Sequence, residues 1–482
     1  MIISTKNKDL IAFFGLFVIS IFFTYKLPVY ISYLWFWALL ILFLMAKQEH
    51  NHLWLMFFWL LFSSPGYLFY KMGIYHLPTI AFPGEDRELY YPEIFIILAI
   101  IKAIVYPVKQ EFFYKQPLLI IICFSTLLLV QGFFQGTSSL TVLKSLRYFI
   151  PLLILYFIPS LIPYSLVPRT ISLMFASVFI LLATQLIDLL AGLPIAVILG
   201  ETHIMFSGQE VNVDSSVFNV STDAVRTVYG PFILLLSLII SMIFLVRKNC
   251  FFKNYYVVLI SILSSFSIFM SATRGWIIAV AFLFIGLFFI GTKKFTKIAL
   301  VFLVLISIIL TIPKINLQII QVVERTLTIK DLAKGDLTAG GSLSRLTERG
   351  PKVMKKFYEQ PVLGYGFSEE YYKFLDGHVG NQSLLLNGGI IGFTIYLIFI
   401  LSFLRYYIIA YVNKNNNTAF IFIFGLLSLI IIHSSSTMVF AYALNVDIAI
   451  ALGLFMFFSA YFIDHNYKMY LMKSNSQVPA HA

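Results

Sequence analysis

The stretch GHVGNQSLLLNGGIIGF, residues 377–393, marks the point where a long polar segment gives way to an apolar run. The polar segment covers residues 314–385, and apolar runs lie on both sides of it. A charged segment of this length inside so apolar a chain predicts a folded part outside the membrane. Segment 314–385 is therefore expected to be one large loop that connects two hydrophobic parts of the chain, and stretch 377–393 marks where the second part begins.

The composition is typical of an integral membrane protein. Hydrophobic residues make up 60% of the 482 residues and charged residues 12%, whereas soluble domains carry roughly 25% charged residues. Apolar runs recur from Ile11 to Phe462, each of the ~17–25 residues that cross about 30 Å of hydrocarbon as a helix. A membrane β-barrel would show alternating segments of about 10 residues instead. The sequence predicts an all-α fold, a polytopic transmembrane helical bundle.

We expect about fourteen spans, or about twelve if two of the runs are re-entrant or merged. The expected spans are residues 9–25, 30–46, 52–70, 92–107, 117–132, 146–163, 169–196, 229–246, 254–270, 275–291, 296–313, 386–411, 417–434 and 444–463. The chain then divides into four parts. Residues 1–313 form the first eleven spans, 314–385 a loop domain of short helices, 386–465 the C-terminal spans and 466–482 a polar tail.

The distribution of basic residues predicts the orientation. With the N-terminus inside, 17 of the 34 Lys and Arg residues fall on the inner side, and the short outer segments hold only 7. Short cytoplasmic loops carry such an excess of positive charge. Both termini are therefore expected in the cytoplasm, and segment 314–385 on the external, periplasmic or extracellular side. The net charge of +12 fits these loops and anionic membrane lipids, and no nucleic-acid partner is expected.

Four basic residues at outer ends of spans are candidates for binding an anion. Arg274, in SATRGW, lies in a tight outer turn, and Arg226, in STDAVRTVYGPF, precedes another span. Each arginine either extends to lipid phosphates or offers its planar fork of donors to a substrate phosphate. Lys144 and Arg147 lie three positions apart, which places them on one helical face.

The long segment supplies the remaining candidates. Arg345 belongs to SLSRLTERG, and PKVMKKF after it is expected to form either an interfacial helix on lipid or an ordinary surface helix. PVLGYGF, residues 361–367, is a turn cluster. His378 and Asn381 come directly before the next span. His378 either bonds to backbone at a helix end or acts as a general base near neutral pH.

The order of these motifs resembles the O-antigen ligase/polymerase superfamily of membrane glycosyltransferases. The match covers mainly residues 215–400, with an outer Arg before a span, an S-x-x-R-G turn, a long outer loop with P-x-x-G-x-G, and His and Asn before G-x-x-G. Many members place Asn directly after His, whereas Val379 and Gly380 intervene here. The role of Asn381 is therefore open.

The resemblance implies an enzyme of the bacterial inner membrane that takes a glycan from an undecaprenyl-diphosphate carrier without a metal or other cofactor. Arg226 and Arg274 would hold the diphosphate, and His378 would activate or position an acceptor hydroxyl. Arg345, Asn381, Arg147 and Lys144 would contribute to substrate binding. The expected partners are a lipid-linked oligosaccharide donor, a glycan or lipid A core acceptor and membrane lipids, with a chain-length regulator as an additional partner.

Three functions remain open. The first is a polymerase that joins repeat units of O-antigen, capsule or exopolysaccharide. The second is a ligase that moves the glycan to lipid A core or protein. The third, from another class, is a lipid-glycan transporter or flippase, for which the carboxylates Asp188 and Asp447 in apolar spans are the supporting feature. His433 and the serines after it are interpreted as a structural or cavity-lining helix end.

Overall fold

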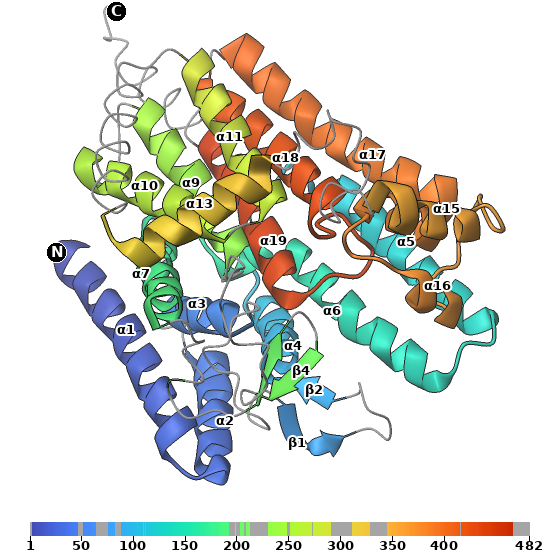
Figure 1. Ribbon diagram of the computed structural model, residues 1–482, viewed down its shortest axis with the longest axis horizontal. Helices are drawn as coiled ribbons and strands as arrows, with labels where there is room; N and C mark the ends of the chain where they lie inside the picture. The colour runs from blue at the N-terminus through green and yellow to red at the C-terminus, as the bar shows by residue number, and fades with distance from the viewer. Residues whose placement is uncertain are drawn as a thin grey trace, which may run out of the picture.

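The computed structural model describes residues 2–46, 52–63, 76–81, 88–108, 110, 112–191, 198, 203–206, 209–212, 230–247, 251–271, 273–290, 311–327, 345–414 and 416–465. Most of them lie in helices of one bundle (Figure 1). The helices of the N-terminal part are α1 (Ile2–Lys26), α2 (Val29–Met45), α3 (His52–Ser63), α4 (Tyr91–Val105), α5 (Lys115–Phe134), α6 (Ser139–Leu161) and α7 (Val167–Ala191). Those that follow are α9 (Pro231–Val246), α10 (Asn254–Met270), α11 (Arg274–Phe289), α13 (Pro313–Leu327), α15 (Gly350–Phe357), α16 (Glu369–Phe374), α17 (Gly380–Lys414), α18 (Asn417–Ser435) and α19 (Val446–Ala460).

The expected helical architecture is confirmed. Seven described helices are long and apolar enough to cross a membrane, and five shorter apolar helices accompany them. All but one of the expected spans overlap a described helix. Residues 64–70 and 192–196 of two of them, and most of the span expected at 296–313, lie outside the described residues. Several apolar helices of this kind indicate a multi-pass membrane protein.

Two short β-hairpins depart from the all-α expectation. Strands β1 (His76–Ala81) and β2 (Glu88–Tyr90) pair antiparallel, as do β3 (His203–Phe206) and β4 (Gln209–Asn212). Both hairpins fall in segments between expected spans, which carry no apolar run that would force a helix. They are small additions beside the helical bundle (Figure 1).

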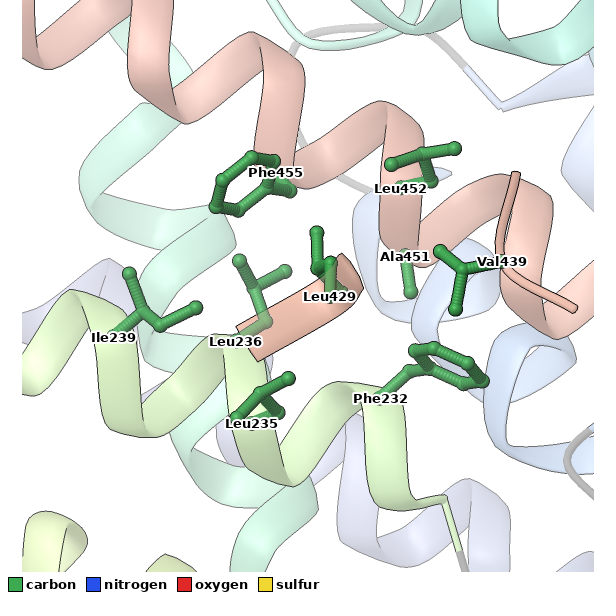
Figure 2. A pocket seen from close by; sticks show the side chains of 9 residues that line it. All are labelled: Phe232, Leu235, Leu236, Ile239, Leu429, Val439, Ala451, Leu452 and Phe455. Carbon is green, nitrogen blue, oxygen red and sulfur yellow. The ribbon is translucent and has the colours of Figure 1, made fainter. Parts of the chain in front are cut away.

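The centre of the bundle is built from α9 and α19. Every residue of α19, from Val446 to Ala460, is buried, and α9 is buried along its length from Pro231 to Leu245. A void of about 10 Å³ lies between α9, α18 and α19, and only apolar side chains line it (Figure 2). A void of that size with no polar partner does not hold an ordered water, so it is a packing defect of the core and not a ligand site.

The described parts of the polar segment, 314–327 and 345–385, contain the short helices α13, α15 and α16 and the first residues of α17. Helix α13 crosses the ends of α7 and α10 (Figure 1), and Gln318 Nε2 donates to the carbonyl of Met270 at 3.1 Å. In α15, Val353 and Phe357 are buried and Lys352 and Lys355 are exposed. The apolar face of α15 therefore packs on the protein, and Lys352 and Lys355 lie on the surface.

The turn PVLGYGF, expected from its sequence, packs against a break in α17. The break is at Gly389, whose φ of 64° and ψ of −166° suit only glycine. Ile390 N donates to Pro361 O at 2.8 Å, and Tyr365 N donates to Leu386 O at 2.9 Å. A Cβ added at Gly389 would lie 2.2 Å from Val362 O. This close backbone contact anchors the turn directly before α16 and the loop that carries His378.

Candidate functional site

His378 lies in the loop between α16 and α17 and contacts the chain just after α18. Its Nδ1 atom is 2.8 Å from the carbonyl oxygen of Ser436, and its backbone N–H donates to Asp376 Oδ1 at 2.9 Å. A carbonyl oxygen only accepts, so Nδ1 carries the hydrogen and Nε2 is the basic nitrogen of the neutral ring. The backbone bond matches the structural interpretation of this residue, and the same bond sets the tautomer that a general base requires.

The start of α17 packs on the last turn of α18. Asn381 Nδ2 donates to Ser434 Oγ at 3.0 Å. A Cβ added at Gly380 would lie 2.2 Å from the carbonyl oxygen of His433, so only glycine allows this approach. Asn381 thus contacts the segment that also binds His378, although two residues separate it from the histidine.

Arg274 begins α11, which meets the same end of α18. The half-buried Arg274 precedes Gly275, where an added Cβ would lie 2.1 Å from Ser436 Oγ and 2.4 Å from Ser435 Oγ. The structure therefore brings the two expected catalytic residues, Arg274 and His378, to one segment of three serines, 434–436. Arg226, the third expected catalytic residue, lies outside the described residues.

A second histidine shapes the segment after these serines. His433, which is 3% exposed, accepts at Nδ1 from the backbone N–H groups of Val439, at 3.2 Å, and Phe440, at 3.3 Å. It therefore has the tautomer opposite to that of His378, with its hydrogen on Nε2. His433 holds residues 437–440 in place, as expected for a structural residue at this helix end.

A cavity of about 300 Å³ lies beside this segment. Its wall comes from α6, α16, the loop before His378, the segment after α18 and the start of α19. The lining residues are Lys144, Tyr148, Tyr371, Tyr372, Leu375, Gly377, Thr437, Met438, Ala443, Asn445 and Ile448. Gly377 is adjacent to His378, and Thr437 is adjacent to the Ser436 carbonyl that binds its ring, so the wall reaches the histidine loop from both sides.

The phenols of the cavity are hydrogen-bonding groups that stay protonated. Burial raises the pKa values of Tyr371 and Tyr372 above their ordinary value of 10.0. The Tyr372 hydroxyl donates to Ser145 Oγ at 3.0 Å, which ties α16 to α6. The cavity is therefore lined by tyrosine, threonine and asparagine side chains beside apolar ones.

The two basic residues of α6 have different environments. Lys144 lines the cavity, and its Nζ lies 5.2 Å from the centroid of the Tyr372 ring. Arg147 instead forms an ion pair with Glu93 of α4, and both side chains are 12% exposed. The structure thus places Lys144 at the candidate site and Arg147 in a contact between two helices.

Sequence reasoning missed the ion pair that anchors the histidine loop. Arg349 donates from Nη2 to Asp376 Oδ1 at 2.7 Å and from Nε to Oδ2. Asp376 lies two residues before His378 and accepts from its backbone N–H. Arg345, the expected binding residue of the same motif, begins a π-helical turn that ends at Arg349. The sequence feature that could have drawn attention to Arg349 is its position at the start of a helix, directly before Gly350 and Pro351 of α15.

The arrangement provides an aromatic, hydroxyl-lined cavity, a histidine with a fixed tautomer, and an arginine at the same bundle end. No protein-family model matches this chain. No curated protein matches it either.

Proposed function

We propose that this protein is a membrane glycosyltransferase, related to the O-antigen ligase/polymerase superfamily, that joins oligosaccharide units carried on a lipid diphosphate. The observation that carries the proposal is the cavity beside His378, whose Nδ1–H bond to Ser436 sets Nε2 as the proton acceptor. Tyrosine rings and hydroxyls in the wall fit a sugar, and a volume of about 300 Å³ is at the lower end of small-molecule pockets.

In the proposed reaction, a hydroxyl of the acceptor glycan attacks the anomeric carbon of the donor. The new glycosidic C–O bond forms as the bond from the anomeric carbon to the phosphate oxygen breaks. The hydroxyl proton passes to Nε2 of His378, and the lipid diphosphate leaves with the bonding electrons. Arg274, at the start of α11, supports this step by stabilising negative charge that develops on the diphosphate. The acceptor in a polymerase is the glycan of another lipid-linked unit.

We further propose that the His378 end of the bundle faces outward. The asymmetry of Lys and Arg supports this orientation, with both termini in the cytoplasm. A cysteine introduced for Lys355 in α15 should react with an impermeant thiol reagent outside intact cells, and one introduced for Lys253, before α10, should not. Both variants are made after replacing Cys123 and Cys250 with serine. Labelling of only the Lys253 position would contradict the orientation.

Transfer itself is tested with purified protein in lipid vesicles and the lipid-linked repeat unit as sole substrate. A polymerase produces a ladder of longer lipid-linked chains and releases lipid diphosphate. Consumption of donor only after lipid A core is added would identify a ligase and contradict polymerisation. Movement of intact donor across the vesicle membrane, with no new glycosidic bond, would identify a transporter and contradict the enzyme.

A further inference from the structure

Lys144 is a half-buried cation in the wall of the cavity. It extends from the first turns of α6, and its Nζ lies 5.2 Å from the centroid of the Tyr372 ring. Within the described ranges of the chain, no carboxylate lies within ion-pairing distance of this ammonium group. An anion in the cavity would therefore meet an ammonium group that no described carboxylate neutralises.

The acidic side chains around the cavity have other partners. Glu93 pairs with Arg147, Asp376 with Arg349, and Glu370 with Lys356 at 3.0 Å. Asp447, next to the lining residue Ile448, accepts hydrogen bonds from backbone N–H groups of its own helix turn. None of the lining residues is acidic. Among the described residues, the wall therefore carries one positive charge, and the nearby carboxylates already have other hydrogen-bonding or ionic partners.

The positions of Lys144 and Tyr372 place the anion relative to a sugar. A sugar ring can stack its apolar face on an aromatic ring while its hydroxyls meet Thr437, Asn445 and the phenols. A charged substituent on a sugar in the cavity can approach the Lys144 ammonium, because Lys144 lines the same wall as the tyrosines. A negatively charged oxygen group there makes a charge-assisted hydrogen bond.

We infer that this cavity selects a sugar ring bearing an anionic group, either a carboxylate or a phosphate, through Lys144. The inference rests on the proposed function and adds the chemical class of the glycan. An ammonium group is a point charge and binds a carboxylate or a phosphate. The geometry therefore indicates an anionic substituent, and the experiment distinguishes a carboxylate from a phosphate.

The test measures binding to purified protein in nanodiscs by isothermal titration, which needs no turnover. The probes are methyl glucuronide, glucose 1-phosphate, the neutral methyl glucoside and inorganic pyrophosphate. At least one anionic sugar should bind about 10- to 100-fold more tightly than the glucoside. Lys144→Met should abolish this preference and Lys144→Arg should retain it. Lys355→Met, on an exposed lysine of α15, should behave as the unchanged protein.

Three results would overturn the inference. The first is equal affinity for neutral and anionic sugars, and the second is a preference for anionic sugars that survives in Lys144→Met. The third is Lys144-dependent binding of pyrophosphate but of neither anionic sugar, which would show that Lys144 binds the diphosphate of the carrier lipid. The inference and the proposed function fail separately. A protein that binds anionic sugars but never extends a glycan loses only the function. A protein that extends glycans without anion preference loses only the inference.

Discussion

The imidazole Nδ1 of His378 lies 2.8 Å from the carbonyl oxygen of Ser436, a residue 58 positions away in the sequence. The bond links the start of α17 to the end of α18, and a Cβ added at Gly275 would lie 2.1 Å from Ser436 Oγ. The same few atoms therefore set the tautomer of His378 and the position of α11, whose first residue is Arg274.

Replacement of Arg274 tests its proposed role in binding the diphosphate. Arg274→Ala should lower transfer about 10- to 100-fold, because a charge-assisted contact contributes about 1.5–3 kcal/mol. Arg274→Lys should also be impaired, because lysine keeps the charge but lacks the planar fork. The measurement is the initial rate with lipid-linked donor, and Lys355→Ala is the control. Normal transfer by Arg274→Ala, at normal expression, would exclude this role.

The ion pair of Arg349 and Asp376 should act on the reaction by holding the histidine loop. Arg349→Met and Asp376→Asn should each raise amide hydrogen exchange in residues 376–383 and lower transfer about fivefold, because a partly exposed pair contributes about 1 kcal/mol. The double variant should transfer as fast as either single variant, because each substitution removes the same ion pair. Additive losses would show that the two side chains act independently.

The break in α17 should tolerate no side chain. Gly389→Ala puts a Cβ 2.2 Å from Val362 O in a backbone conformation reserved for glycine, and should destabilise the protein by about 1–3 kcal/mol. Its melting temperature should fall clearly below that of the unchanged protein. Gly15→Ala, in α1, meets no atom within 4 Å and should melt normally. Equal melting of the two variants would contradict the packing described for PVLGYGF.

A pH dependence is expected from the contact between α16 and α6. The hydroxyl and backbone N–H of Ser138 lower the pKa of Glu369 below its ordinary value of 4.5. A carboxyl with a lowered folded-state pKa stabilises the fold above its unfolded pKa, and this contribution disappears as the pH falls through the folded value. Melting temperatures between pH 6 and pH 3 should therefore fall more for the unchanged protein than for Glu369→Gln. Glu348→Gln should follow the unchanged protein, and identical curves for all three would refute the contact.

The helices could be predicted from the sequence because lipid requires long apolar runs. The residue at which α17 begins could not be predicted in this way. The apolar run begins near residue 386, but the helix begins at Gly380, where Asn381 bonds to Ser434. That contact joins residues 53 positions apart, and hydropathy carries no information about it.

The sequence indicated candidate residues for the site, but it did not indicate which side chains they contact. His378 and Asn381 bond to the segment at the end of α18, and Gly275, the neighbour of Arg274, approaches the same segment, but their role as one site stays a prediction. The pairing of Arg147 with Glu93 and of Arg349 with Asp376 depends on which helices are neighbours. Charge and spacing alone gave Lys144 and Arg147 the same role, whereas packing separates them.

The most direct test of the account replaces His378 while keeping its bond to Ser436. Asparagine presents its Nδ2 donor near the position of the histidine Nδ1 but has no counterpart of Nε2, so His378→Asn removes the base and preserves the structural contact. Wild-type protein with lipid-linked repeat unit should release lipid diphosphate and lengthen the glycan. His378→Asn should bind the donor normally and react about 10²- to 10⁴-fold more slowly. Lengthening of the glycan by His378→Asn at the wild-type rate would contradict the central claim, because the histidine would then serve the fold alone.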